Sequence, residues 1–208
     1  MENFPDAPFE FDLPESGGCS IALIGSTRAG KTHALIKLLN MYFKSHCGVL
    51  MTGSAQANIY KGAPKHIIQA DKFIPRVIKD MAMINKGTDN NYEFLAVLDD
   101  VVHGVKFNPE ILKLLCVYRN SNVSCIISAQ AITLLNSAGR TNINFVCLFK
   151  LNSDEQAEKV IKAYLNSYFP PKMKMAEKIR AYREACEDHH FFVVDNLNGK
   201  VFRTKCPE

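Results

Sequence analysis

The sequence contains no long uninterrupted hydrophobic run. No apolar segment approaches the roughly 20 residues that a helix needs to cross a bilayer. Residues 1–18 also contain no lysine or arginine, so the basic region that precedes the apolar part of a secretory signal is missing. We therefore expect a protein that is neither secreted nor membrane-spanning.

Paired cysteine spacing is also absent. Several of the seven cysteines lie inside apolar runs, where a thiol behaves as a small core side chain; the seven are Cys19, Cys47, Cys116, Cys125, Cys147, Cys186 and Cys206. This distribution favours a reducing, intracellular setting.

Acidic and basic side chains are unevenly distributed along the chain. Residues 1–18 hold five of the 21 acids, which leaves 16 acidic against 25 basic side chains, a net charge of +9, on residues 19–208. A net charge this positive on residues 19–208 is compatible with a polyanionic partner such as nucleic acid. A basic but solvated surface explains the charge equally well.

Short apolar runs alternate with longer amphipathic segments over most of the chain. Strands are predicted near 19–24, 48–53, 66–69, 93–99, 123–128 and 144–150, and helices over 30–45, 73–86, 108–118 and 153–166. This alternation predicts an α/β fold with a mainly parallel central sheet flanked by helices.

The two ends of the chain depart from this alternation. Prolines and a Gly17-Gly18 pair predict an irregular acidic arm over residues 1–18. After Pro170-Pro171, a helix over 172–187 and a β-hairpin over 190–205, turning at Asn198-Gly199, are predicted. At 208 residues one compact domain is expected, divided into the arm, a core over 19–168, and a C-terminal helix and hairpin over 169–208 packed on the core.

A phosphate-binding loop follows the first predicted strand. Residues 25–32 read Gly25-Ser26-Thr27-Arg28-Ala29-Gly30-Lys31-Thr32, between apolar residues 20–24 and a helix. Glycines let backbone N–H groups turn inward around phosphates, and the helix adds its positive N-terminal end. Lys31 is expected to reach the β- and γ-phosphates, and the Thr32 hydroxyl to ligate magnesium. The core is therefore predicted to be a P-loop NTPase that binds ATP or GTP with Mg²⁺.

A second nucleotide element is the apolar strand 94–98, which runs directly into Asp99 and Asp100. Asp99 is the candidate magnesium ligand, and Asp100 is in a position to orient or deprotonate the attacking water. The alternative is that both acids simply cap the following turn.

A third element is Ser128-Ala129-Gln130, at the end of the predicted strand 123–128. If this strand lies between the first strand and the carboxylate strand, Gln130 brings a neutral amide to the γ-phosphate and can report its presence. Polar residues commonly end strands, so the indication depends on the position of this element after the other two.

The order of these motifs, followed by Gly139-Arg140-Thr141-Asn142 before apolar residues 145–149, resembles the FtsK/HerA superfamily of DNA-pumping motors. Within that superfamily the chain is most similar to the genome-packaging ATPases of poxviruses, giant viruses, virophages and polinton-like elements. The resemblance covers roughly residues 19–165 and implies a RecA/ASCE-like P-loop fold.

The resemblance also implies roles for individual residues. Gln130 matches the polar sensor of the family, and Arg140 matches a basic residue that enters a neighbouring subunit's active site, where a planar cation stabilises the charge on the γ-phosphoryl oxygens. Without the family pattern, Arg140 would be interpreted as an exposed loop arginine. Arg119 matches a further basic position whose role is not defined. The broader superfamily often has glutamate after the metal-binding aspartate, whereas this chain has the shorter Asp100.

The resulting hypothesis is an ATP-driven, ring-forming motor that moves double-stranded DNA into a viral capsid. ATP and Mg²⁺ are the expected ligands, and the expected catalytic residues are Lys31, Asp100, Gln130 and Arg140. The expected partners are double-stranded DNA, further copies of the chain, and a capsid or portal protein. The expected location is intracellular, in the host cytoplasm or nucleus at the site of virion assembly, with transient virion association.

Two alternatives remain open. The first is a nucleoside or nucleotide kinase, which shares the loop and the size, although the arginine-rich lid expected of such an enzyme is not evident. The second is a nucleotide-switched DNA-binding or assembly protein that hydrolyses slowly and does not translocate.

Overall fold

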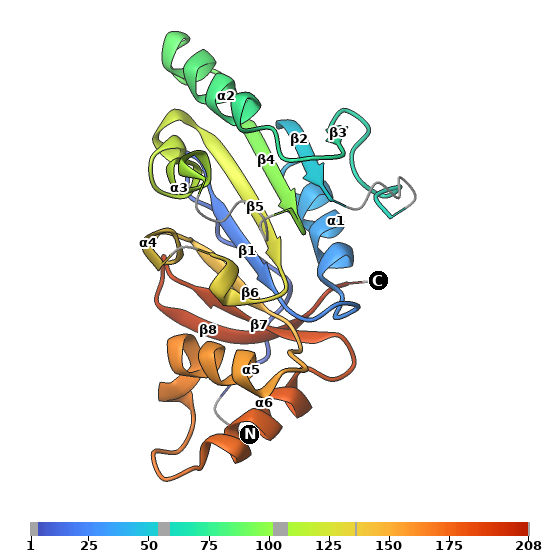
Figure 1. Ribbon diagram of the computed structural model, residues 1–208, viewed down its shortest axis with the longest axis vertical. Coiled ribbons are helices and arrows are strands. Elements are labelled where there is room, and N and C mark those ends of the chain that lie inside the picture. The colour runs from blue at the N-terminus through green and yellow to red at the C-terminus, as the bar shows by residue number, and fades with distance from the viewer. Residues whose placement is uncertain (1–3, 54–58, 102–107, 136, 208) are drawn as a thin grey trace.

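An eight-stranded sheet runs through the centre of the molecule (Figure 1). The computed structural model describes residues 4–53, 59–101, 108–135 and 137–207. The strand order is β3-β2-β4-β5-β1-β6-β7-β8. The first six strands of this order are mutually parallel. β7 pairs antiparallel with β6, and β8 pairs antiparallel with β7. The strands are β1 (Ser20–Ile24), β2 (Cys47–Thr52), β3 (Ile68–Ala70), β4 (Phe94–Asp99), β5 (Val123–Ala129), β6 (Phe145–Leu148), β7 (His190–Asp195) and β8 (Lys200–Lys205). The prediction of a mainly parallel sheet is confirmed.

The central strands bring the ends of several motifs to one edge of the sheet. β5 lies between β1 and β4, as the sensor hypothesis required. Its apolar residues are buried on both faces, which explains the continuous apolar run in the sequence. The register pairs Asp99 with Thr52 on one side and with Ser128 on the other. The carboxyl ends of β2, β4 and β5 are therefore level with one another.

Helices cover both faces of the sheet (Figure 1). They are α1 (Lys31–Tyr42), α2 (Pro75–Gly87), α3 (Pro109–Cys116), α4 (Ser137–Arg140), α5 (Asp154–Val160) and α6 (Met175–Ala185). α1 packs on one face through an apolar stripe that includes Leu35 and Leu38. α2, α3, α5 and α6 contribute to the core on the opposite face.

Two helices differ from the lengths that the sequence predicts. The helix predicted over 153–166 changes after Val160 into a π-helical turn, Ile161–Leu165, and the wider turn brings Val160, Ile161 and Leu165 all into the core. The helix predicted over 108–118 ends at Cys116, and a 3₁₀ turn, Tyr118–Ser121, leads into β5. The C-terminal hairpin is formed by β7 and β8, as predicted.

The N-terminal arm wraps around the edge of the sheet at β8. Phe4 packs on the face that carries α5 and α6, whereas Phe9 and Phe11 are buried on the α1 face. Between these points the Asp6 carboxylate accepts two hydrogen bonds from the Arg203 guanidinium, at 2.5 and 2.7 Å, and the backbones of the two residues form a parallel bridge. The division of the chain into arm, core and C-terminal segment stays a prediction.

The helices within the described ranges are all too short or too polar to cross a bilayer.

Candidate nucleotide site

The loop between β1 and α1 is fixed by close backbone contacts. A Cβ on Gly25 would lie 2.5 Å from Cβ of Phe149, so only glycine fits there. The Gly25 N–H donates to the Ala129 carbonyl at 3.2 Å, and the Ser26 N–H donates to the Lys150 carbonyl at 3.0 Å. Gly30, with φ of +96°, is the N-cap of α1 in a conformation that favours glycine. The sequence thus forms a rigid turn that delivers α1 to the end of β1.

The start of α1 is suited to an anion. Its first turn contains no acidic residue, so the positive end of the helix is not neutralised locally. Lys31 is buried, and its Nζ donates to the carbonyls of Gly25 and Ser26 at 2.7 and 3.0 Å. Burial lowers the pKa of Lys31, and the charges of Asp100 and Asp99 oppose that shift. Phosphate oxygens would supply this ammonium with a direct anionic partner.

A row of oxygen-bearing side chains lies across the carboxyl ends of β2, β4 and β5. Thr52, Asp99 and Ser128 are paired in register and are all buried. Tyr60 donates a hydrogen bond from its hydroxyl to Oδ2 of Asp99 at 2.5 Å, and the same hydroxyl is hydrogen-bonded to Thr52 Oγ1 at 3.1 Å. Burial and the Asp99 hydrogen bond raise the pKa of Tyr60, so the phenol stays protonated and remains a donor.

The Ser128 hydroxyl is the unpaired member of this row of oxygen-bearing side chains. Its side chain is 1% exposed, and among the described residues Oγ has no hydrogen-bond partner. A buried polar atom left unpaired is costly, which points to a ligand or bound water as its partner. The neighbouring Asp99 is the nearest charged group along the sheet register.

Asp100 lies one residue beyond β4 in a left-handed conformation, with φ of +55°. Burial and the charge of Asp99 raise the pKa of Asp100, whereas Lys31 and hydrogen bonding by the Gln130 amide act in the opposite direction. The Asp100 N–H donates to the Ser128 carbonyl at 3.3 Å, so Asp100 lies beside the end of β5, which Gln130 directly follows. The structure therefore gathers Lys31, Asp99, Asp100 and Gln130 around the loop, with Thr32 in the first turn of α1. Their catalytic roles stay predictions.

Arg140 is not part of this cluster. It ends α4, just before β6, and the adjoining Asn142 carbonyl accepts a hydrogen bond from Ser20 Oγ at the start of β1. Gly139 lets α4 approach α3, because a Cβ there would lie 2.7 Å from Leu115 Cδ1. The loop at 25–32 follows the other end of β1. At about 3.3 Å per residue, the length of β1 separates Arg140 from the loop of its own chain.

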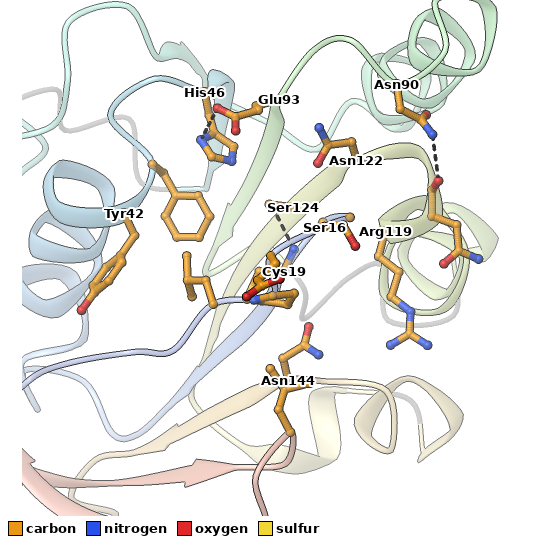
Figure 2. Close-up of a pocket in the computed structure, with 18 residues that line it drawn as sticks. Ser16, Cys19, Tyr42, His46, Asn90, Glu93, Arg119, Asn122, Ser124 and Asn144 are labelled. Carbon is orange, nitrogen blue, oxygen red and sulfur yellow. Dashed lines mark hydrogen bonds and ion pairs between the residues drawn. The ribbon is translucent and has the colours of Figure 1, made fainter.

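A hollow of about 920 Å³ also lies at the amino end of the strands. Figure 2 shows Arg119 and Asn122, from the 3₁₀ turn before β5 and its C-cap, and Asn144, just before β6, around this hollow. His46 lies on its wall, with Nδ1 3.7 Å from Glu93 Oε2, and burial lowers the pKa of that imidazole while Glu93 opposes the shift. This hollow is distinct from the nucleotide site, because the loop follows the opposite ends of the strands. The structure assigns Arg119 to this wall and leaves its role a prediction.

Together, the strand order, the glycine loop and the buried lysine define a P-loop ATPase. Comparison with protein families identifies which one: the model of the Poxvirus A32 protein matches residues 13–202, and the chain belongs to that family. No match was found among curated protein sequences.

Solved structures with the same fold include viral and bacterial ATPases. The genome packaging NTPase B204 from Sulfolobus turreted icosahedral virus 2, in complex with AMPPCP, is 14% identical with a TM-score of 0.63, and the match covers 94% of this chain and 100% of B204. B204 of Sulfolobus turreted icosahedral virus, a DNA-packaging ATPase, is 15% identical with a TM-score of 0.59, over 90% and 97% of the two chains. ATPases 2 and 3 of EssC from Geobacillus thermodenitrificans are 14% identical with a TM-score of 0.55, over 76% of this chain and 36% of theirs.

The sequence patterns did not predict Tyr60, which is 39 residues from Asp99 in an irregular segment.

We expect Tyr60→Phe to lower the rate of ATP hydrolysis about 10- to 100-fold, because a partner that orients a metal-binding carboxylate typically contributes that much. The change keeps the ring and removes only the hydroxyl. Turnover measured against Mg²⁺ concentration checks this: the variant should need more Mg²⁺ for half-maximal rate. Tyr92→Phe, at an exposed position, is the matched control, and an unchanged Mg²⁺ requirement in Tyr60→Phe would show that the hydroxyl does not position Asp99.

Proposed function

We propose that this viral genome-packaging ATPase uses ATP hydrolysis to move double-stranded DNA into a capsid, as a homo-oligomeric ring. The observation that carries the proposal is the separation of the predicted catalytic residues. Lys31, Asp99 and Asp100 surround the loop at one end of the sheet, and Arg140 lies beyond the other end. A site that needs Arg140 is therefore completed by a second copy of the chain.

At the loop, ATP is proposed to bind through the backbone N–H groups of residues 25–32 and the Lys31 ammonium. The residues nearby fit Mg²⁺: Asp99 offers a carboxylate, Thr32 a hydroxyl, and Ser128 an unpartnered buried hydroxyl that a metal-bound water would satisfy. When bound, Mg²⁺ neutralises phosphate charge. Asp100 would hold the attacking water and accept its proton, and Gln130, beside Asp100, would respond to the γ-phosphate.

The remaining partners follow from charge and family. The +9 charge on residues 19–208, from 25 basic and 16 acidic side chains, suits a double-stranded DNA substrate. A capsid or portal protein would dock the ring to the particle. The proposed location is the host cytoplasm or nucleus, where virions assemble, with transient association with the virion.

We expect ATP turnover per subunit to rise cooperatively with protein concentration and to increase further when double-stranded DNA is added. The reason is that assembly supplies Arg140 to each site, and DNA binding stabilises the assembled ring. Steady-state phosphate release, measured over a range of protein concentrations with and without DNA, checks the expectation. Lys31→Ala, which removes the loop ammonium, is the inactive control.

The opposite result separates the alternatives. Turnover that is independent of both concentration and DNA would contradict a ring motor, and phosphate transfer to an added nucleoside would then identify a kinase. DNA binding that depends on nucleotide but is accompanied by slow hydrolysis and no translocation would identify a switch.

A further inference from the structure

A second, smaller hollow lies directly beside the phosphate-binding loop, on the side of β6, β7 and β8. Its volume is about 510 Å³. The loop contributes Arg28 and Ala29, and the rest of the wall comes from the end of β6, from the turn between α6 and β7, and from the end of β8. The function proposed above assigns no role to this hollow.

The position of the hollow matches the direction in which a bound nucleotide would extend. The carboxylates of Asp99 and Asp100 and the Gln130 amide belong to β4 and β5, which lie on one side of β1. A nucleotide bound in the loop would direct its terminal phosphate to that side. Its nucleoside would then extend to the other side of β1, where β6, β7 and β8 lie in order. The hollow occupies that side.

His189 is the aromatic ring that the turn presents to the loop. A Cβ placed on Gly30 would lie 3.9 Å from Nδ1 of His189, so the imidazole is next to the start of α1. Its side chain is exposed toward the hollow and not packed in the core. An exposed aromatic ring beside a phosphate site can stack on a nucleotide base.

The turn that carries His189 has an unusual backbone. Asp188 and His189 are consecutive non-glycine residues with φ of +52° and +63°. Such conformations persist where the surroundings hold them. Here the His190 N–H donates to the Glu187 carbonyl at 3.0 Å, and Lys150 Nζ, at the end of β6, forms an ion pair with Glu187 Oε1 at 2.6 Å. The turn is thus tied both to itself and to the strand beside the loop.

We infer that this hollow is the base subsite of the nucleotide, and that the His189 imidazole stacks on the base. The inference rests on the proposed binding of ATP at residues 25–32. Stacking is tolerant of base identity, because every base has an aromatic face. His189 is therefore expected to support ATP and GTP to a similar degree, and to contribute nothing to a triphosphate that has no base.

The test uses the full chain and compares ATP with inorganic tripolyphosphate, each with Mg²⁺, by calorimetry. His189→Gly removes the ring at a position whose φ glycine adopts freely, so the turn is not destabilised by the change. We expect this variant to bind ATP and GTP about tenfold more weakly and tripolyphosphate as well as the wild type does. His189→Phe should restore most of the ATP affinity. Asp89→Gly makes the same kind of backbone change at an exposed position with φ of +52°, outside this hollow, and should leave all three affinities unchanged.

Each outcome has one meaning. If His189→Gly binds ATP as tightly as the wild type while Lys31→Ala does not bind it, the base subsite is wrong and the nucleotide site stands. If His189→Gly weakens tripolyphosphate as much as ATP, the residue acts on the loop and not on a base, which also overturns the inference. If the wild type binds neither ligand, the proposed function itself fails.

Discussion

Replacing Arg140 with alanine is expected to lower ATP turnover about 10³- to 10⁵-fold, the contribution typical of an arginine that stabilises transferring phosphoryl charge from a neighbouring subunit. Nucleotide affinity should stay unchanged, because Arg140 lies at the amino end of the strands and the loop of its own chain follows the carboxyl end. Single-turnover hydrolysis and the Kd for ATP, measured separately, distinguish the two effects. Arg180→Ala, at a side chain 74% exposed on α6, is the matched control.

A mixing experiment tests whether Arg140 acts between subunits. Arg140→Ala retains an intact loop and lacks the arginine, whereas Lys31→Ala lacks a working loop and retains the arginine. When the two inactive variants are combined, mixed assemblies should regain part of the activity at sites where the second variant supplies Arg140 to the first. No recovery over a range of ratios, in mixtures shown to assemble, would contradict action in trans.

Asp100→Asn is expected to lower turnover about 10²- to 10⁴-fold, as the loss of a general base does, and to raise the thermal stability of the nucleotide-free protein. The amide keeps the shape of the side chain and tolerates the left-handed backbone, with φ of +55°. At neutral pH it removes a carboxylate that is disfavoured by burial and by Asp99. Because Asp100 is only partly buried and much of it stays exposed to solvent, the gain in Tm should stay within about 3 °C.

The expected stability difference between Asp100→Asn and the wild type depends on pH. The pKa of Asp100 is raised in the folded protein, so the folded state binds the proton more tightly than the unfolded chain does. The stability from that proton is fully present below the unfolded pKa and is lost as pH rises through the folded pKa. The stability advantage of Asp100→Asn should therefore be present at neutral pH and disappear as the solution is acidified.

Asp89→Asn provides the control for both effects. Asp89 has φ of +52° and is exposed beyond the end of α2, so the same chemical change is made in a similar backbone conformation away from the loop. It should alter neither turnover nor the pH dependence of Tm. An Asp100→Asn protein that hydrolyses ATP at the wild-type rate would assign water activation to another group.

Local patterns predicted the parts of the site that are carried by regular elements. The continuous apolar character of β4 and β5 identified buried parallel strands, and parallel strands that are neighbours place the residues after them at one edge. Asp99, Asp100 and Gln130 could therefore be expected near Lys31 from sequence order alone. The strand order of β1, β5 and β4 confirms the arrangement on which that expectation depended.

Residues that reach the site from irregular segments could not be found in this way. Tyr60 and His189 belong to no periodic pattern, and their proximity to Asp99 and Gly30 results from the path of loops between elements. The π-helical turn at Ile161–Leu165 was also missed, because an apolar face continues through it and gives the same signal as a longer α-helix. Long-range packing decides these features.

The arm that wraps around β8 also constrains the order in which the chain can fold. Asp6 meets Arg203 across 197 residues of sequence, so the arm is synthesised long before the strand against which it docks. Until β7 forms, the Phe4 ring lacks its contact with Phe192. Until the arm docks, the backbone edge of β8 is open to pairing with another chain. Positions 1–18 contain five acidic and no basic side chains, so the side chains of the undocked arm carry a net negative charge. Like-charge repulsion between such arms opposes their association before the sheet edge is closed.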